Sequence, residues 1–182
     1  MYKCYNSIQK VKLDASHLLK AKCFAVDVSP STNYGDANQN SRIKIQEDHR
    51  ISKLGEEAAA FVLRQFVSVS DPDYSIYKGN QKSWKEDLQV NGVGVAVKSQ
   101  NSIAANKYGL SWTFQYGPTR KDLIFNNPDA WIIFVEVEEI NETCICRVFP
   151  PFQLKELLFE EPKLIHLKGY KKVVYAHSLK LQ

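Results

Sequence analysis

The dipeptide Asn91-Gly92 constrains the fold of this chain more than any other feature, because it separates two runs rich in apolar and β-branched residues. Both central residues of a type I′ turn need positive φ, which Asn and Gly tolerate better than other residues. We therefore expect a hairpin with strands at 87–90 and 93–99. A two-residue loop also fixes the register, so that Val90 faces Val93, Gln89 faces Gly94, Leu88 faces Val95 and Asp87 faces Ala96.

Side chains alternate across a sheet, so the hairpin has one apolar and one polar face. The apolar face suits a core and consists of Leu88, Val90, Val93, Val95 and Val97. The polar face carries Asp87 and Lys98, one diagonal step apart on neighbouring strands. A carboxylate can hold Mg²⁺, and an ammonium can orient an attacking water or offset charge on a phosphate. An ordinary surface ion pair, worth under ~1 kcal/mol, explains the same pattern, and both interpretations stay open.

The rest of the chain predicts helices first and strands afterwards. Asp14 can cap one helix, and a second is expected over 38–66, after the break that begins at Ser29-Pro30. Further strands are expected at 74–77, 110–116, 131–137, 144–148 and 173–176, with a short helix at 154–159. This order predicts one α+β or α/β sandwich domain with a mostly antiparallel sheet.

Composition suits a single globular domain. The chain has 182 residues, 44% hydrophobic and 24% charged, which excludes a disordered protein. None of the four cysteines stands in a CxxC pair, and Cys144 and Cys146 are expected as buried residues on one strand face. The N-terminus has no signal-like run, and no stretch approaches ~20 apolar residues. We therefore expect a cytoplasmic protein with reduced thiols and no membrane partner.

Charge is unevenly distributed, although the net charge is only +4. From Pro162 to the end there are five lysines and no acidic residue, whereas four glutamates lie between Glu136 and Glu142. A basic edge suits a polyanion, since neutralised phosphates supply most non-specific affinity for nucleic acids. A solvated lysine-rich surface explains the same composition equally well.

Asp87, followed nine positions later by Ala96-Val97-Lys98, resembles the core hairpin of the PD-(D/E)XK, or restriction-endonuclease-like, nucleases. In that superfamily an acid opens one strand and a (D/E)-X-K tripeptide lies on the next. The stretch Lys53-Leu54-Gly55-Glu56-Glu57 is similar to the family's first core helix, and 108–115 is similar to a later strand of phage and bacterial members. The resemblance covers roughly 38–148 and implies a restriction-endonuclease-like core, with a central mixed β-sheet and flanking helices. It also implies the use of Mg²⁺, with Mn²⁺ as a substitute.

The sequence departs from this family pattern at Ala96, which stands where a second carboxylate is usual. Gln100, on the same strand face as Lys98, is one candidate for the missing metal ligand, and Glu56 of the helix is another. The resemblance therefore implies Lys98 as the catalytic lysine and a metal site formed by Asp87, Glu56, Gln100 and the Val97 carbonyl.

The choice among the acids follows from local geometry. Glu57 falls on the helical strip that holds Lys53 and Arg64, which is expected to be solvated. Glu56 falls among small apolar residues, where a glutamate is unusual, so it is the preferred functional acid. Pro72-Asp73 is a rival to Asp87, but it lies in a turn-like stretch without a hairpin register.

Four polar residues around the strand at 110–116 are candidates for nucleic-acid contacts, namely Lys107, Gln115, Arg120 and Lys121. The cations would meet phosphates while the amide reads a base edge or sugar. Loop charges beside a core tryptophan, Trp112, are the alternative. His49 is expected on a helix surface, and Trp84 and Trp131 are expected to cover the core or the sheet.

These features predict one domain over 1–182, with an N-terminal helical extension (1–37), a nuclease-like core (38–148) and a basic C-terminal segment (149–182). The expected activity is Mg²⁺-dependent hydrolysis of double-stranded DNA by a phage-encoded or restriction-type endonuclease, in a bacterial or phage-infected cell. The alternative is a protein that keeps the fold and binds nucleic acid or a protein partner without cleavage. A homodimer would suit the cutting of both strands, by analogy alone.

Overall fold

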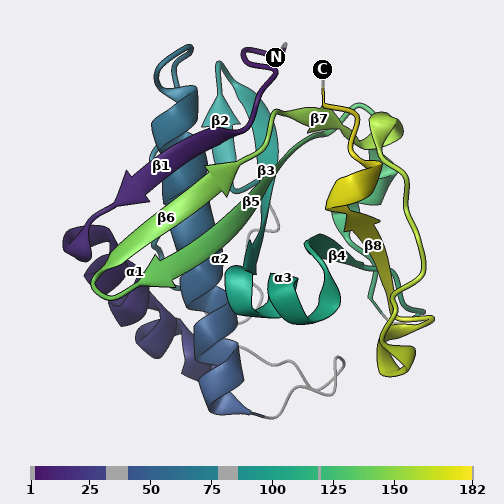
Figure 1. Ribbon diagram of the computed structural model, residues 1–182, viewed down its shortest axis with the longest axis horizontal. Coiled ribbons are helices and arrows are strands. Elements are labelled where there is room, and N and C mark those ends of the chain that lie inside the picture. Colours follow the sequence, from purple (N-terminus) through teal and green to yellow (C-terminus); the bar gives the residue numbers. More distant parts are fainter. Residues whose placement is uncertain (1–2, 32–40, 78–85, 119, 182) are drawn as a thin grey trace.

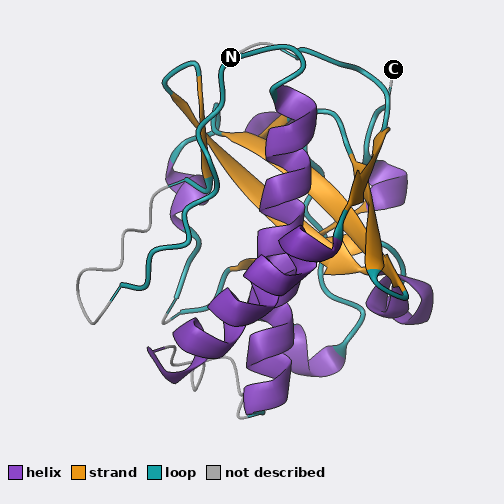
Figure 2. Cartoon of the chain, turned by 90° about the vertical axis from the view of Figure 1, so that its left-hand side faces the viewer, coloured by secondary structure: helices purple, strands orange, loops and turns teal. Residues whose placement is uncertain are grey.

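The computed structural model describes residues 3–31, 41–77, 86–118 and 120–181. Two helices, α1 (Ala15–Val28) and α2 (Arg42–Leu63), lie on one side of a six-stranded mixed sheet (Figure 1, Figure 2). A small two-stranded sheet packs on the other side through a second hydrophobic core. The mixed α/β class predicted from the sequence is confirmed. No helix in the described part of the chain is long and apolar enough to cross a membrane.

The large sheet follows the order β1-β6-β5-β3-β2, and β7 pairs with β5 outside this path. Its strands are β1 (Gln9–Leu13), β2 (Leu88–Val90), β3 (Val93–Asn101), β5 (Trp131–Ile140), β6 (Thr143–Val148) and β7 (Phe152–Gln153). Only β3 and β5 pair in parallel, and a parallel pair requires a crossover connection. That crossover contains α3 (Ser102–Tyr108) and β4 (Ser111–Gln115), which pairs with β8 (Lys171–Tyr175) in the small sheet.

The hairpin of β2 and β3 has the predicted turn and register. Asn91 and Gly92 both have positive φ, 48° and 76°, as a type I′ turn demands. Leu88 pairs with Val95, and Val90 pairs with Val93. On its other side β2 is joined by the segment after α2, because Ser70 N–H donates to Gln89 O at 2.9 Å.

β5 is buried on both faces, which explains its uninterrupted apolar run. Ile133 and Val135 point into the first core, under α2. Ile132 and Phe134 point into the second core, where the Phe134 ring stacks on Trp112 of β4 with 4.5 Å between centroids. β5 therefore packs against the helix layer on one face and against the small sheet on the other.

The N-terminal segment is not the purely helical extension that we predicted. Gln9–Leu13 is a strand that pairs with β6, with Val11 opposite Cys146 and Leu13 opposite Cys144. Both apolar residues are buried while Lys10 and Lys12 are exposed. This period-two alternation is a strand signal that the prediction overlooked.

Residues 74–77 are a loop rather than the predicted strand. Tyr74 is held by side-chain contacts to the helices instead of a backbone ladder: its hydroxyl donates to Glu57 Oε1 at 3.0 Å and its ring meets Phe24 edge-on. The predicted helix at 154–159 is one short 3₁₀ turn, Leu154–Glu156, because the chain then extends to pair Glu160 with Val173. Trp84 and the start of the predicted helix at 38 lie outside the described residues.

Two further elements follow capping residues. The Asn101 side chain accepts a hydrogen bond from Ala104 N–H at 2.7 Å and starts α3, which the sequence analysis did not predict. Asp14 caps α1 as predicted, accepting from Ser16 N–H at 2.9 Å.

Gly55 lies where α2 crosses the sheet at close range. A methyl group at this position would stand 1.8 Å from Ser99 Oγ and 3.5 Å from Val135 Cβ. A glycine costs a helix interior about 1 kcal/mol relative to alanine, and here that cost is offset because the helix can lie directly on β3 and β5. The close contact also brings the next residue, Glu56, toward the edge of the hairpin.

We expect Gly55→Ala to lower the free energy of unfolding by about 1–3 kcal/mol, although alanine is the better helix former, because the added methyl overpacks the contact with Ser99. Urea unfolding followed by circular dichroism measures the change. Ser99→Gly in the Gly55→Ala background should restore part of the loss, because it removes both clashing atoms. A Gly55→Ala protein as stable as the parent would contradict the close contact.

Candidate active site

Asp87 stands one residue before β2, at the point where the ladder between β2 and β3 stops. Its Oδ2 accepts a hydrogen bond from Val97 N–H at 2.7 Å, so the carboxylate takes the place of the next backbone partner. Burial raises the pKa of Asp87, while the Val97 N–H and the charges of Lys98 and Lys53 act in the opposite direction. The residue predicted as the first acid is thus a half-buried carboxylate fixed at the strand edge.

Glu56 reaches the same edge from α2 and is only 3% exposed. Its Oε2 accepts from Lys53 Nζ at 2.7 Å and its Oε1 from Ser52 Oγ at 3.3 Å. Burial, and then repulsion by the Asp87 carboxylate, raise the pKa of Glu56 to about 8, against the lowering influence of Lys53 and Ser52. The helix and the hairpin therefore hold two carboxyl groups that disfavour one another's charge.

Lys98 is not part of an ion pair with Asp87, which was the plainer interpretation of the sequence pattern. Its Nζ donates to Asp122 Oδ2 at 2.8 Å and lies 5.0 Å from the centroid of the Phe114 ring. Its charge still reaches the Asp87 carboxylate, whose pKa it lowers. Lys98 is therefore held between an acid and an aromatic ring on the side of the sheet that faces β4.

Asp122 is a site residue that sequence reasoning missed. It stands at the N-cap of a 3₁₀ turn, Leu123–Asn126, where an aspartate usually accepts from the helix backbone. Here it makes no capping bond, and its carboxylate turns to Lys98 instead. Only the fold brings these two residues together, because they lie on different elements 24 positions apart.

Glu57 does not lie on a solvated strip, as the helix pattern predicted. It is 8% exposed, and its Oε1 accepts from Lys20 Nζ and from the Tyr74 hydroxyl, both at 3.0 Å. The prediction was wrong because α1 covers this side of α2, a contact that no helical wheel shows. Lys53 accordingly pairs with Glu56, the acid that the same pattern favoured for function.

Gln100 has a different environment from the other predicted metal ligands. Its Oε1 accepts from Ser111 N–H at 2.8 Å and its Nε2 donates to Gly109 O at 3.4 Å. The amide therefore fastens the end of β3 to the start of β4. Val97, whose carbonyl was also predicted as a ligand, points its side chain into the first core.

The rival acid, Asp73, belongs to a turn of its own. Its carboxylate accepts from Ser75 N–H at 2.8 Å and from the Tyr77 hydroxyl. Its backbone carbonyl accepts from Lys53 Nζ at 2.6 Å, so the loop approaches the Glu56 side of the site with a carbonyl rather than a carboxylate.

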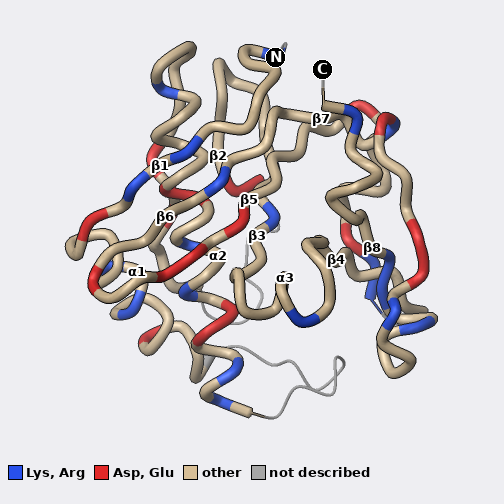
Figure 3. Tube along the Cα trace, viewed as in Figure 1, with Lys and Arg blue, Asp and Glu red and all other residues tan. Residues whose placement is uncertain are grey.

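Cations gather around β8 and the loop after β4 (Figure 3). Gln115 pairs with Lys171 at the end of the small sheet, and Gln115 O accepts from Asp122 N–H at 2.9 Å. Burial lowers the pKa of Lys171, and the charges of Lys98 and Arg120 add to this effect, while Asp48 and Asp122 oppose it. Lys171 was counted among the C-terminal lysines of the sequence but was not proposed there as a site residue. Lys171 shares one charged region with Lys98, Arg120 and Gln115.

The other predicted contacts lie farther out on the surface. Lys121 is exposed, with its Nζ 4.9 Å from the Tyr116 ring centroid, and Lys107 is exposed at the end of α3. Trp112 is a core residue whose Nε1 donates to Val135 O at 3.1 Å. His49 is half-buried against Phe24 rather than free on the surface.

Two smaller predictions about buried residues hold. Trp131 is partly buried against the first core. Cys144 and Cys146 are both buried on one face of β6, with their sulfur atoms 3.5 Å apart.

Glu56 and Asp87 have the chemistry of a Mg²⁺ site. Among the described residues no group of three or more His, Cys, Asp or Glu side chains comes together. Mg²⁺ commonly binds through one or two carboxylates and completes its octahedron with waters and substrate phosphates. A cation between the two carboxyls would relieve the repulsion that raises the pKa of Glu56. Glu56 and Asp87 would supply two carboxylate ligands if such an ion bound at this junction.

Comparison with known proteins adds no neighbour: the chain matches no protein-family model, no curated protein sequence and no solved structure.

We expect the unfolding free energy of the metal-free protein to fall as pH rises from about 5 to about 8. The pKa of Glu56 lies above its ordinary value in the folded state, so its contribution to stability is present at low pH and is lost as pH rises through about 8. One proton corresponds to at most about 1.4 kcal/mol per pH unit. Glu56→Gln should flatten this slope in urea unfolding curves taken at each pH in EDTA.

Glu57→Gln is the matched control for this pH dependence. It changes the neighbouring buried glutamate and removes the negative charge of the acceptor for Lys20 and Tyr74, so it should lower stability at every pH without flattening the slope. A Glu56→Gln protein that keeps the parent slope would show that Glu56 is not the group responsible.

Proposed function

We propose that the chain is a Mg²⁺-dependent DNA endonuclease of the PD-(D/E)XK type, with Asp87, Glu56 and Lys98 at its centre. The observation that carries this proposal is the junction of α2 with the hairpin. Gly55 allows the helix to lie directly on β3, so that the charge of the strand acid Asp87 reaches the buried helical acid Glu56, and the charge of Lys98 reaches Asp87. The order of helix, hairpin and acids agrees with the family that the sequence resembles.

In this proposal Glu56 and Asp87 hold the ion, with the Val97 carbonyl and Gln100 as further candidates. When bound, Mg²⁺ polarises a phosphate oxygen and makes a bound water more acidic. Glu56 must give up its proton to act as a ligand, because burial favours its neutral form. Lys53 compensates part of the charge through its 2.7 Å bond to Oε2.

Lys98 is suited to contact the phosphate or orient the attacking water. Its bond to Asp122 keeps the ammonium in place, and a phosphate can replace this carboxylate because both accept the same kind of hydrogen bond. The side chain is 26% exposed, so a ligand can reach it. Arg120, Gln115 and Lys171 would contact the neighbouring backbone, which positions a strand without reading its sequence.

The alternative function, a protein that binds nucleic acid and no longer cleaves it, is favoured by one feature. Ala96 packs against the second core at the position where the family carries an acid, and the Gln100 amide is engaged with Ser111 and Gly109. The site then relies on two carboxylates rather than three.

We expect Asp87→Asn and Lys98→Ala each to reduce cleavage of plasmid DNA, in Mg²⁺ or Mn²⁺, by at least about 100-fold. The two should differ in metal binding. Mn²⁺ should raise the melting temperature of Lys98→Ala but not of Asp87→Asn, because of these two residues only Asp87 is a proposed metal ligand. Glu138→Gln, an exposed acid on β5, is the control for nonspecific charge effects. DNA binding without cleavage by the parent protein would favour the alternative, and no binding at low salt would contradict both.

We expect Ala96→Glu to increase Mn²⁺ affinity by about tenfold, because it adds a carboxylate ligand to the site. The bound ion can offset the free-energy cost of burying this charge. Ala96→Gln has the same size without the charge and should show no gain. Isothermal titration with Mn²⁺ measures the difference, and Ala96→Asp offers a smaller acid if the longer side chain disturbs the second core. Equal affinities for Ala96→Glu and Ala96→Gln would place Ala96 away from the ion.

A further inference from the structure

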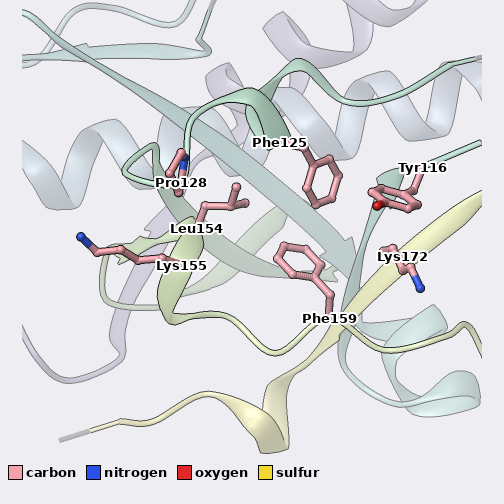
Figure 4. Close-up of a pocket in the computed structure, with 7 residues that line it drawn as sticks. All are labelled: Tyr116, Phe125, Pro128, Leu154, Lys155, Phe159 and Lys172. Atoms are coloured by element: carbon pink, nitrogen blue, oxygen red, sulfur yellow. The ribbon is translucent and has the colours of Figure 1, made fainter.

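A concave site lies between the small sheet and the 3₁₀ turn Leu123–Asn126. It has a volume of about 290 Å³ and is formed chiefly by Tyr116, Phe125, Leu154, Phe159, Lys155 and Lys172 (Figure 4). Ligand pockets begin at about 300 Å³, so this one suits a single ring system rather than a large molecule. The three aromatic rings lie on one side of it, and the two lysines extend at opposite ends.

The aromatic walls of this pocket hold one another in place. The Phe125 ring meets Tyr116 edge-on at 5.0 Å and Phe159 at 5.1 Å between centroids. Both phenylalanines also contact Phe114, which is fully buried in the second core. The rings are therefore fixed by the core before any ligand binds, which lowers the entropy cost of binding.

The cations around the pocket favour an anionic ligand. Lys121 Nζ lies 4.9 Å from the Tyr116 centroid and 5.6 Å from that of Phe125. Lys155 pairs with Asp129 and Lys172 with Glu161, whose carboxylates are 62% and 52% exposed. Such exposed ion pairs contribute under ~1 kcal/mol, so a phosphate can displace either acid. Aromatic walls with cations at both ends match a base with a phosphate on each side.

Phe114 connects this pocket with Lys98. The Lys98 ammonium lies 5.0 Å from one ring, Phe114, and that same ring contacts the pocket walls Phe125 and Phe159. Asp122, the partner of Lys98, is also the residue directly before the turn that carries Phe125. Lys98 and two pocket walls therefore contact the same buried ring, which places the pocket near Lys98.

We propose that this pocket binds one unstacked nucleobase of a single-stranded or locally opened DNA segment, with the flanking phosphates on Lys155 and Lys172. The inference rests on the proposed nucleic-acid function and adds the conformation of the substrate. Base–aromatic stacking tolerates any base, because every base has a π face. The pocket thus serves to hold an extruded base in register with the site, rather than to read a sequence.

Fluorescence anisotropy of the full chain with two labelled eight-nucleotide single strands tests the proposal. One strand carries bases, and the other is abasic at every position. In EDTA, without cleavage, the parent protein should prefer the base-bearing strand by about tenfold. Phe125→Leu and Phe159→Leu should lose this preference while keeping the affinity for the abasic strand. Tyr108→Leu, an exposed aromatic on α3 outside the pocket, should keep it.

The lysines have a separate readout. Lys155→Gln and Lys172→Gln should weaken binding of both strands and reduce the slope of log affinity against log salt by about one each. Circular dichroism melting of every variant shows whether the fold is intact.

Equal affinity of the parent for the two strands, or a preference that survives both phenylalanine variants, would overturn the proposal. A proline-rich peptide that binds in a Phe125-dependent way, when the strands do not, would assign the pocket to a protein partner instead. A base preference without cleavage in Mg²⁺ would leave this inference standing and contradict the nuclease proposal. Cleavage without a base preference would support the nuclease proposal and contradict the base-binding pocket.

Discussion

The contact between Gly55 and Ser99 determines how close α2 lies to the sheet, and much of the proposed chemistry depends on that separation. A side chain at position 55 would push the helix outward and move Glu56 away from Asp87. Ser99 Oγ is itself buried without a hydrogen-bond partner among the described residues. The missing hydrogen bond costs free energy, which the close packing of α2 on β3 offsets. A helix interior with glycine and a strand with an unsatisfied hydroxyl are each unfavourable alone, and together they permit the approach.

The electrostatics of the site follow from the same approach. Glu56 is shielded from water by the helix layer, while Asp87 is fixed at the strand edge by the Val97 N–H. Desolvation and mutual repulsion then favour the neutral form of Glu56 unless a cation is present. On the far side of the sheet, Lys98 has its own acid, so its charge is already partly compensated. The two sides therefore differ: one has two carboxyl groups near a single lysine, Lys53, and the other has the ion pair of Lys98 with Asp122.

The hairpin was the part of the fold most open to prediction, because Asn91-Gly92 specifies a turn type and the turn specifies the register. Glu56 was preferred over Glu57 because only Glu56 was expected among apolar residues, whereas the structure buries both glutamates. The role of Glu57 depends on α1, and the position of Asp122 depends on the crossover that packs β4 over β3. Contacts of this kind join residues that are distant in the chain, so the local periodicity of the sequence does not predict them. The strand Gln9–Leu13, by contrast, had a local alternation that was available and overlooked.

The shortness of β2 affects how the charged groups on the two faces of the sheet influence one another. Glu56 approaches from the α2 face, whereas Lys98 lies on the face that carries Phe114. β2 has only three residues, and directly before it the Asp87 carboxylate accepts the hydrogen bond of the Val97 N–H. A ladder that continued to Glu86 would give the Val97 N–H a backbone partner in place of the Asp87 carboxylate. The short strand therefore leaves at the edge of the sheet a carboxylate that senses charge from both faces, because Lys53 of α2 and Lys98 beside Phe114 both lower the pKa of Asp87.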